Sequence, residues 1–342
     1  VLVEPALVGP SARLAVACLG CGLHERAYCA YANACYREPD NKSARRGREV
    51  CLSLLPLWSS VEGRARQARF AVDCHRPRAR ARIYSVSDLF FDKNQEEWAH
   101  NINPTKFLDD VLIIAGNVAG SLPKVERALR ALRPKFRRLF YVPGNRELWT
   151  YPNLEDHNEY PDAIAKLLQL FRLCDRLDVD VFPASIAEDV FVVPLLSWYS
   201  ATFDIKDPFP NPDRSTDNRA VWPVDAQSEA WKYMMSLNER HLAKPYHGTV
   251  VTFSHFAPRA SCKVYKGLEK YSGCLELDTQ VRNCRSSVHV YGHTHARQTF
   301  LEDGVHYINH SVGPRSTNSS VHEPIMCVFN GQRVCADLEA IS

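Results

Sequence analysis

Long apolar stretches are missing from this sequence. The longest mainly apolar runs, residues 50–58 and 190–199, are far shorter than the roughly 18 residues that a membrane-spanning helix needs. We therefore expect no transmembrane segment. No internal repeat is present either.

Paired cysteine motifs are also scarce. The chain holds 12 cysteines but only one Cys-x-x-Cys pair, Cys18 and Cys21, whereas zinc sites commonly use two such pairs. The sequence leaves open whether the N-terminal cysteines bind zinc, form disulfides or stay free. These six cysteines are Cys18, Cys21, Cys29, Cys35, Cys51 and Cys74.

The charge is distributed unevenly along an otherwise ordinary globular composition. Residues 1–82 carry 14 Lys and Arg against 7 Asp and Glu, a balance of +7; the rest carries 28 against 32, a balance of −4. We therefore predict a basic, irregular, Cys-rich N-terminal extension over residues 1–80 and a core domain over 81–342.

The most basic part of this extension is residues 64–82, "RARQARFAVDCHRPRARAR". Such a segment favours binding to RNA or to an acidic protein surface. The alternative is a solvated arm or the tail of a targeting region. The Arg- and Ala-rich start, which begins at Val1 rather than Met, favours an organelle, a mitochondrion or a plastid; a truncated sequence is the other explanation.

From residue 81 onwards, strand-like and helix-like patterns alternate. Strand patterns cover 82–88, 110–116, 138–144, 189–199, 248–255, 287–295, 297–301, 305–308 and 325–329; amphipathic helix patterns cover 122–133, 164–177 and 225–243. Residues 203–223 are rich in Pro, Asp and Asn, which is typical of a loop. The order favours an α/β core whose second half is largely β.

Polar clusters follow five of these strands directly. In open α/β sheets the carboxyl ends of strands gather the functional residues, so we expect one shared site. The clusters are Asp88-Leu89-Phe90, Gly116-Asn117, Gly144-Asn145-Arg146-Glu147, Ser254-His255 and Gly292-His293-Thr294-His295.

This series resembles the motifs D-x-H, G-D, G-N-H-[D/E], H and G-H-x-H of the calcineurin-like metallophosphoesterases. The resemblance covers residues 81–331. "LLSWYSATFD" (195–204) and "FSHFAPR" (253–259) look most like the plant and algal branch. The resemblance implies a four-layer α/β/β/α sandwich and hydrolysis of phosphoesters by two metal ions that clamp the phosphate.

Carried over by position, the resemblance implies two sets of metal ligands. The first set comprises Asp88, Phe90, Asn117 and His295. The second set comprises Asn117 as the shared bridge, Asn145, His255 and His293. Position 146 corresponds to the histidine that assists the leaving group, and this chain has Arg146 there.

Three of these positions do not suit that chemistry. Phe90 cannot ligate a metal, and Asn117 lacks the negative charge of a bridging carboxylate. A guanidinium about 5 Å from a dication repels it by roughly 6–7 kcal/mol at an effective dielectric of about 20, which is about four to five decades of affinity. Arg146 also stays protonated and cannot act as a general acid near neutral pH.

We therefore expect a protein that has lost two-metal catalysis, needs no cofactor, and serves as a structural or binding subunit of a larger organellar assembly. We expect Arg146 to occupy the volume of a metal and to pair with Asp88 or Glu147; the alternative is that it points to solvent. Arg259 and Arg315 are candidates for binding an anion in the cleft.

The alternative function is a metal-dependent phosphomonoesterase or phosphodiesterase with an altered site. It would use a single Zn, Mn or Fe ion. His255, His293 and His295 would supply the imidazole ligands that such an ion accepts.

Overall fold

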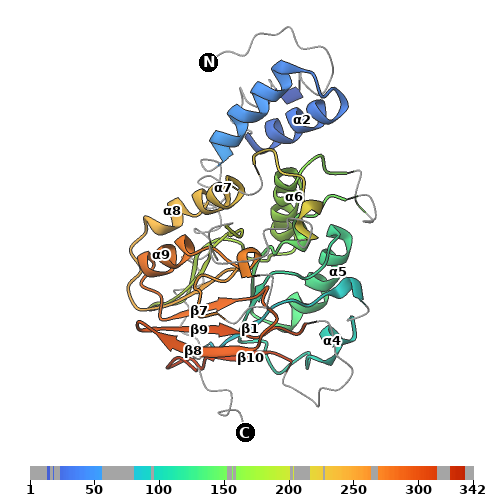
Figure 1. Cartoon of the computed structure of the whole chain (residues 1–342). Helices are drawn as coiled ribbons and strands as arrows, with labels where there is room; N and C mark the ends of the chain where they lie inside the picture. The colour runs from blue at the N-terminus through green and yellow to red at the C-terminus, as the bar shows by residue number, and fades with distance from the viewer. Residues whose placement is uncertain are drawn as a thin grey trace.

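The computed structural model describes the following residues of the 342-residue chain: 14–15, 18, 24–55, 81–93, 96–151, 156, 159–200, 203, 216–225, 228–262, 269–313 and 324–335. Two β-sheets face each other, and helices cover both outer faces (Figure 1). The expected four-layer α/β/β/α sandwich is confirmed.

The smaller sheet has four strands in the order β10-β1-β2-β3. β1 (Ile83–Val86), β2 (Val111–Ala115) and β3 (Arg138–Val142) run parallel, and β10 (Met326–Phe329) is antiparallel to β1. The carboxyl ends of β1, β2 and β3 therefore lie at one edge.

The larger sheet has six strands in the order β4-β5-β6-β7-β9-β8. β5 (Val190–Pro194), β6 (Thr249–Phe253), β7 (Val288–Tyr291) and β9 (Val305–Asn309) are parallel. β4 (Ala184–Ala187) and β8 (Gln298–Glu302) are antiparallel edge strands.

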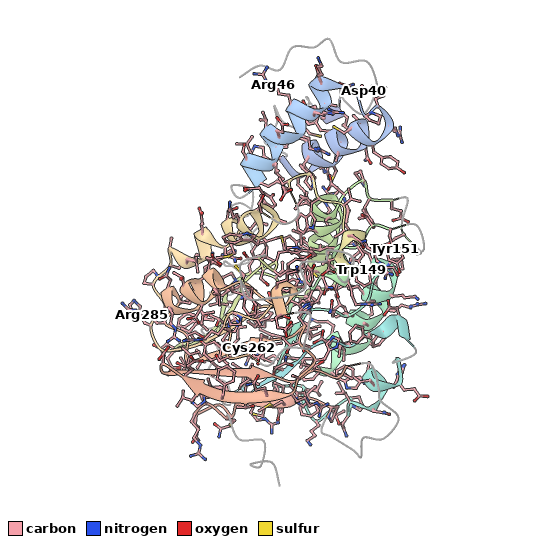
Figure 2. The ribbon with its side chains drawn as sticks, in the orientation of Figure 1. Asp40, Arg46, Trp149, Tyr151, Cys262 and Arg285 are labelled. Carbon is pink, nitrogen blue, oxygen red and sulfur yellow. The ribbon has the colours of Figure 1, made fainter. Side chains whose placement is uncertain are left out.

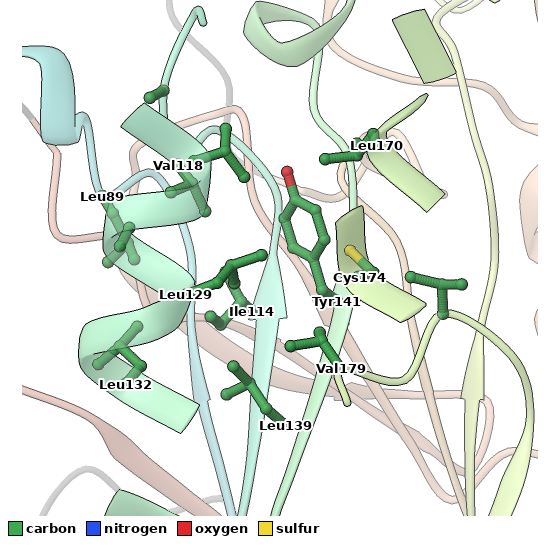
Figure 3. Packing of buried hydrophobic residues seen from close by; sticks show 14 of the residues in the cluster. Leu89, Ile114, Val118, Leu129, Leu132, Leu139, Tyr141, Leu170, Cys174 and Val179 are labelled. Carbon is green, nitrogen blue, oxygen red and sulfur yellow. The ribbon is translucent and has the colours of Figure 1, made fainter. Parts of the chain in front are cut away.

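Strands in this core carry apolar side chains on both faces. One face of each sheet packs against the other sheet, and the opposite face packs against helices. Val111 and Ile113 of β2 pack between the sheets against residues such as Val251. Leu112 and Ile114, pointing the other way, pack under α5 (Leu122–Leu132) and α6 (Ala163–Arg176), where they meet residues such as Leu129 and Leu170 (Figure 3).

The predicted helices 122–133 and 164–177 are confirmed as α5 and α6. The predicted helix 225–243 is instead two short helices, α7 (Ala230–Ser236) and α8 (Glu239–Leu242). The sequence patterns missed α4 (Glu96–Asn101), β4 and α9 (Glu276–Asn283), which are short. Most of the predicted loop 203–223 lies outside the described residues.

The N-terminal extension is helical where the structure describes it, so the prediction of an irregular segment is wrong there. α2 (His24–Arg37) and residues 42–55 form helices. Small alanines made the pattern weak, but Ala27, Tyr28, Tyr31 and Ala34 lie on one buried face of α2, at helical spacing.

This face of the extension packs on the core through α6. Tyr28 and Tyr31 join a buried cluster with Ile164 and Leu168 of α6. The Tyr28 hydroxyl also donates to Asp162, 2.9 Å away, and Asp162 caps the N-terminus of α6 by accepting from Ala165 N. The extension is therefore in direct contact with the core.

Ten cysteines lie in the described part of the chain, and all ten are free thiols. Cys21 and Cys74 lie outside it, as does the basic segment 64–80. None of the described helices is both long and apolar enough to cross a bilayer.

Candidate functional site

Five loops that follow β1, β2, β3, β6 and β7 meet at one edge of the sandwich. Within these loops, five residues other than glycine have positive φ angles between 48° and 66°: Asp88, Phe90, Asn117, His293 and His295. Such backbone is costly for side-chain-bearing residues and is typical of functional loops held by their surroundings. The structure thus brings the predicted strand-end clusters together at one edge.

Asp88 is the buried centre of this site, with no exposed surface. Its Oδ2 accepts from the Ser87 hydroxyl at 2.7 Å and from the backbone N–H of His293 at 3.1 Å. Its Oδ1 lies 3.4 Å from Nε2 of His295. Burial by itself raises the pKa of Asp88, but its contacts with His295, together with His255 and Ser87, outweigh burial and lower the pKa below its usual value.

Asn117 connects the two halves of the site through its amide. Nδ2 donates to Asp88 Oδ1 at 3.0 Å, and Oδ1 accepts from the backbone N–H of Arg146 at 3.1 Å. The family motif has a bridging carboxylate at this position. In this chain the amide nitrogen and oxygen of Asn117 both form hydrogen bonds within the protein.

Arg146 pairs with Asp92, which corrects the expected pairing with Asp88 or Glu147. The side chains of Arg146 and Asp92 are only 12% and 13% exposed, so Arg146 does not point to solvent. Its guanidinium carbon lies 5.0 Å from the centroid of Phe90 and 4.8 Å from that of Trp149. Phe90 in turn contacts the ring of His295 edge-on, at 5.2 Å.

Asp88 and Glu147, the two carboxylates expected to pair with Arg146, both accept hydrogen bonds from other groups. Glu147 has no exposed surface and accepts from the backbone N–H groups of Asn117, Val118, Ala119 and Gly144. It therefore holds the loops after β2 and β3 together. Asp88 accepts from Ser87, Asn117 and His293. Arg146 instead pairs with Asp92, whose carboxylate lies on η1 (Phe91–Lys93).

The second half of the site contains three acceptor atoms oriented by their neighbours. The Nδ1 atom of His255 is 2.8 Å from the carbonyl oxygen of Ala115, so this nitrogen carries the proton and Nε2 carries a lone pair when the ring is neutral. Nδ2 of Asn145 donates to Asp217 at 2.7 Å, which turns Oδ1 towards His255 Nε2, 3.2 Å away. Two acceptors that face each other at this distance need a cation or a proton between them.

His293 is also oriented by a backbone carbonyl oxygen. Its Nε2 atom is 3.0 Å from the carbonyl oxygen of Tyr271, which places the lone pair on Nδ1. That Nδ1 atom is buried and has no hydrogen-bond partner in the described residues. Burial, together with the neighbouring His255, lowers the pKa of His293 to about 3, so the ring stays neutral and able to bind a metal.

The two metal positions implied by the family motifs therefore differ in fit. At the first, Phe90 fills the ligand position and a guanidinium lies beside it, so an ion does not fit. At the second, Asn145, His255 and His293 offer one oxygen and two nitrogens, and each side chain is oriented by a hydrogen bond to a carboxylate or a backbone carbonyl oxygen. In the described part of the chain no group of three or more His, Cys, Asp or Glu side chains forms a metal site; the amide of Asn145 would be the third ligand.

Arg259, a candidate for binding an anion, is surrounded by carboxylates. It lies within 3.3 Å of Asp278, 2.9 Å of Glu302 and 2.8 Å of Asp303. An anion would have to displace these three carboxylates, which speaks against an anion site there. Arg315 lies outside the described residues.

Sequence reasoning missed three residues of the site. Asp92 lies four positions after Asp88, and a carboxylate so near to the first motif was the available signal. Asp217 comes from η5 (Thr216–Arg219) and accepts from both Asn145 and Trp149. Tyr271 contributes only its backbone carbonyl, which no sequence pattern can reveal.

Comparison with known proteins gives three findings. The family model described as calcineurin-like phosphoesterase matches residues 73–297. The curated protein "[Acyl-carrier-protein] phosphodiesterase PptH" of Mycobacterium tuberculosis is 33% identical over 101 residues, and this match spans 28% of the chain and 29% of that protein's length. The crystal structure of phosphopantetheinyl hydrolase (PptH) from the same organism has a TM-score of 0.60 at 22% identity and covers 74% of the chain and 97% of that structure.

Proposed function

This chain belongs to the calcineurin-like phosphoesterase family, and we propose that it has lost two-metal hydrolysis and acts as a structural or binding subunit. The observation that carries the proposal is the stack of Arg146 on Phe90, closed by the ion pair with Asp92. In this proposal the three side chains take up the volume of a first metal ion, and Asp92 neutralises the guanidinium, so the unit replaces the volume of the ion and not its charge.

The bridge between the two metal positions supports the same proposal. In two-metal hydrolases a shared anionic ligand holds the ions about 3.5–4 Å apart. The amide of Asn117 has no charge, and its nitrogen is turned to Asp88. The fold remains intact because the amide satisfies Asp88, which would otherwise be a buried carboxylate in need of a cation.

We further propose that the N-terminal extension attaches the protein to a larger assembly in an organelle. The basic composition of residues 1–82 supports this part, with an acidic protein surface as the preferred partner and RNA as the other. Gel filtration of a native organelle extract would test it. We expect elution well above the 38.8 kDa of the single chain, and elution as a monomer would refute this part.

Hydrolysis assays test the proposed loss of catalysis. The full chain is incubated with p-nitrophenyl phosphate and bis(p-nitrophenyl) phosphate after loading with Mn, Zn or Fe. We expect rates equal to those of buffer containing the same metal. Turnover that follows the protein through purification and disappears in His255→Asn would refute the proposal.

A second candidate is a phosphoesterase that uses a single ion at Asn145, His255 and His293. The unpartnered Nδ1 of His293 and the facing acceptors of Asn145 and His255 favour it. An ion held there would polarise a phosphoryl oxygen and lower the pKa of a bound water. The PptH relative is named as a phosphodiesterase and a hydrolase, which makes phosphodiesters the first substrates to try.

A further inference from the structure

The chain turns back on itself at the end of β10. Asn330-Gly331 is a dipeptide typical of tight turns between strands, and Gly331 has the positive φ, 92°, that such turns need. The side-chain oxygen of Asn330 accepts from the backbone N–H of Arg333 at 3.0 Å. Phe329 then pairs with Val334 in an antiparallel bridge. The returning chain therefore runs along the edge of β10 opposite to β1.

Two backbone hydrogen bonds join this returning segment to β10. Asn330 N donates to Arg333 O at 3.1 Å, and Cys335 N donates to Val328 O at 3.0 Å. The second bond places the backbone of Cys335 beside Val328, which directly follows Cys327 in the sequence. A hairpin with so few bonds opens easily, so a single added cross-link would change its stability strongly.

The thiols of Cys327 and Cys335 lie on the same face of this hairpin. Both belong to the apolar cluster that packs under α5 and α6, in which Cys327 is 8% exposed and Cys335 is half-buried. Cys327 is also the sheet partner of Tyr84 on β1. Burial is the main cause that raises the pKa of Tyr84 to about 12, and both thiols contribute to this rise. The two sulfur atoms therefore share one neighbour.

The two thiols also contact each other. Burial raises the pKa of Cys327 to about 12, and Cys335 adds to this rise through its charge and through a side-chain hydrogen bond. Both sulfur atoms lean towards the turn: Cys327 Sγ donates to Phe329 O at 3.4 Å, and Cys335 Sγ donates weakly to Arg333 O at 3.8 Å. Backbone pairing, the shared cluster and this contact thus place one buried thiol beside one accessible thiol.

We propose that Cys327 and Cys335 form a reversible disulfide that clamps the hairpin after β10, with glutathione disulfide as the oxidant. Cys335 reacts first because it is the more accessible thiol. Its thiolate bonds to one sulfur of glutathione disulfide, and the other glutathione leaves. Cys327 then attacks the Cys335 sulfur and releases the second glutathione. The two cysteines lose two electrons and two protons, which the two released glutathione molecules carry.

The disulfide would respond to the thiol–disulfide balance around the protein and alter the edge of the smaller sheet. It closes the short loop 327–335, which lowers the entropy of the unfolded chain. Because β10 pairs with β1, and β1 leads to Asp88, the stabilised edge lies next to a strand that carries the site. The cross-link uses none of the metal positions of the family, so it does not depend on the proposed loss of catalysis.

Peptide mapping of the full chain tests the proposal. The protein is reduced, freed of reductant, equilibrated with glutathione buffers from reduced to oxidised, and trapped with N-ethylmaleimide. Trypsin cleaves after Arg315 and Arg333, so Cys327 and Cys335 fall into separate peptides that only a disulfide keeps together. We expect the joined peptides in oxidised buffer and their separation in reduced buffer. Oxidation should also raise the melting temperature by about 2–6 °C.

Two variants serve as matched controls. Cys335→Ala should lose both the joined peptides and the rise in melting temperature. Cys262, labelled in Figure 2, is also buried, but its side-chain hydrogen bond runs to Tyr291, so Cys262→Ala should keep both effects. Circular dichroism confirms that each variant is folded.

Three results would overturn the proposal. The wild type could keep both thiols in oxidised buffer, or Cys335 could carry only bound glutathione. Cys335→Ala could also gain as much stability from oxidation as the wild type, which would place the effect elsewhere in the chain.

Discussion

The guanidinium of Arg146 lies over the ring of Phe90, with 5.0 Å between the guanidinium carbon and the ring centroid, and pairs with Asp92. Two departures from the family motifs are thus in contact with each other. A phenyl ring alone would leave the buried Asp92 without a cation, and an arginine alone would lack the ring that covers it. Their contact supports the proposal that the first metal position has been rebuilt as a small packed unit.

The first prediction concerns the stability of this unit. Arg146→Ala should lower the free energy of unfolding by about 2–4 kcal/mol, because removal of one partner leaves the other charge buried and unpaired. The double variant Arg146→Met/Asp92→Asn should lose clearly less. Arg130→Ala, which breaks an exposed pair with Glu126, is the control and should cost under about 1 kcal/mol. Urea unfolding measures all three; equal losses in Arg146→Ala and the control would show that the stack contributes nothing.

The second prediction concerns Asn117. Asn117→Asp places a carboxylate about 3 Å from Oδ1 of Asp88, and two like charges so close raise the pKa of one of them. A carboxyl group with a raised pKa in the folded state stabilises the protein at low pH, and this stability is lost as the pH rises through that pKa. The variant should therefore melt closer to the wild type at pH 4 than at pH 7. A melting temperature offset that does not change with pH would contradict the contact between these side chains.

The third prediction restores the family motifs. The combined variant Phe90→His, Asn117→Asp and Arg146→His should recover the binding of two ions, because Asp88, Asn145 and the three histidines are in place. Asp92→Asn should be added, since Asp92 otherwise loses its partner. Addition of Mn should raise the melting temperature of this variant by clearly more than that of Arg259→Gln in the wild-type background, which has at most one metal position. A restored chain that folds and yet binds no metal would refute the ligand assignment.

Most of the fold was predictable, because strands covered on both faces have continuous apolar sequence and because the strands end in recognisable polar clusters. The positions of Asp88, Asn117 and the histidines at one edge followed from that. The partner of Arg146 was not predictable: it depends on which carboxylate has free acceptors, and the four backbone donors to Glu147 appear only in three dimensions. α2 was missed because alanines give little contrast between its buried and exposed faces.

The fourth prediction concerns the contact between the extension and the core. Tyr28 and Tyr31 are both fully buried on α2, but only Tyr28 has a partner for its hydroxyl, Asp162, while the Tyr31 hydroxyl has none in the described residues. Tyr28→Phe should cost about 0.5–1.5 kcal/mol, whereas Tyr31→Phe should be neutral or stabilising. Thermal unfolding distinguishes the two; the reverse order would contradict the docking of α2 on α6.

Deletion of residues 1–80 follows from the same contact. The remaining core should fold, since both sheets and the site lie after residue 81, but Ile164 and Leu168 would be uncovered. We expect a lower melting temperature and a tendency to associate. Light scattering measures the second effect, and a truncated chain without secondary structure would show that the extension is part of the folding core.

The fifth prediction concerns pH. His289 is fully buried between Thr252 and Ser254, and burial lowers its pKa to about 3. Between that pKa and the usual 6.5 the unfolded chain binds a proton that the folded chain does not, so stability falls as the pH drops from about 6.5 towards 3, by up to about 1.4 kcal/mol per pH unit. His289→Gln should flatten this slope and the exposed-site variant His247→Gln should not. Part of the slope should remain, because the pKa of His293 is also lowered to about 3, but a slope in His289→Gln equal to that of the wild type would contradict a neutral buried ring.

The metal content of the purified full chain tests the central claim most directly. The protein is saturated with Mn or Zn, freed of unbound metal by gel filtration, and measured by plasma mass spectrometry for ions per chain. We predict no more than one ion, held by Asn145, His255 and His293 and lost in His293→Asn. Two ions per chain, with Arg146 displaced from Phe90, would contradict the account.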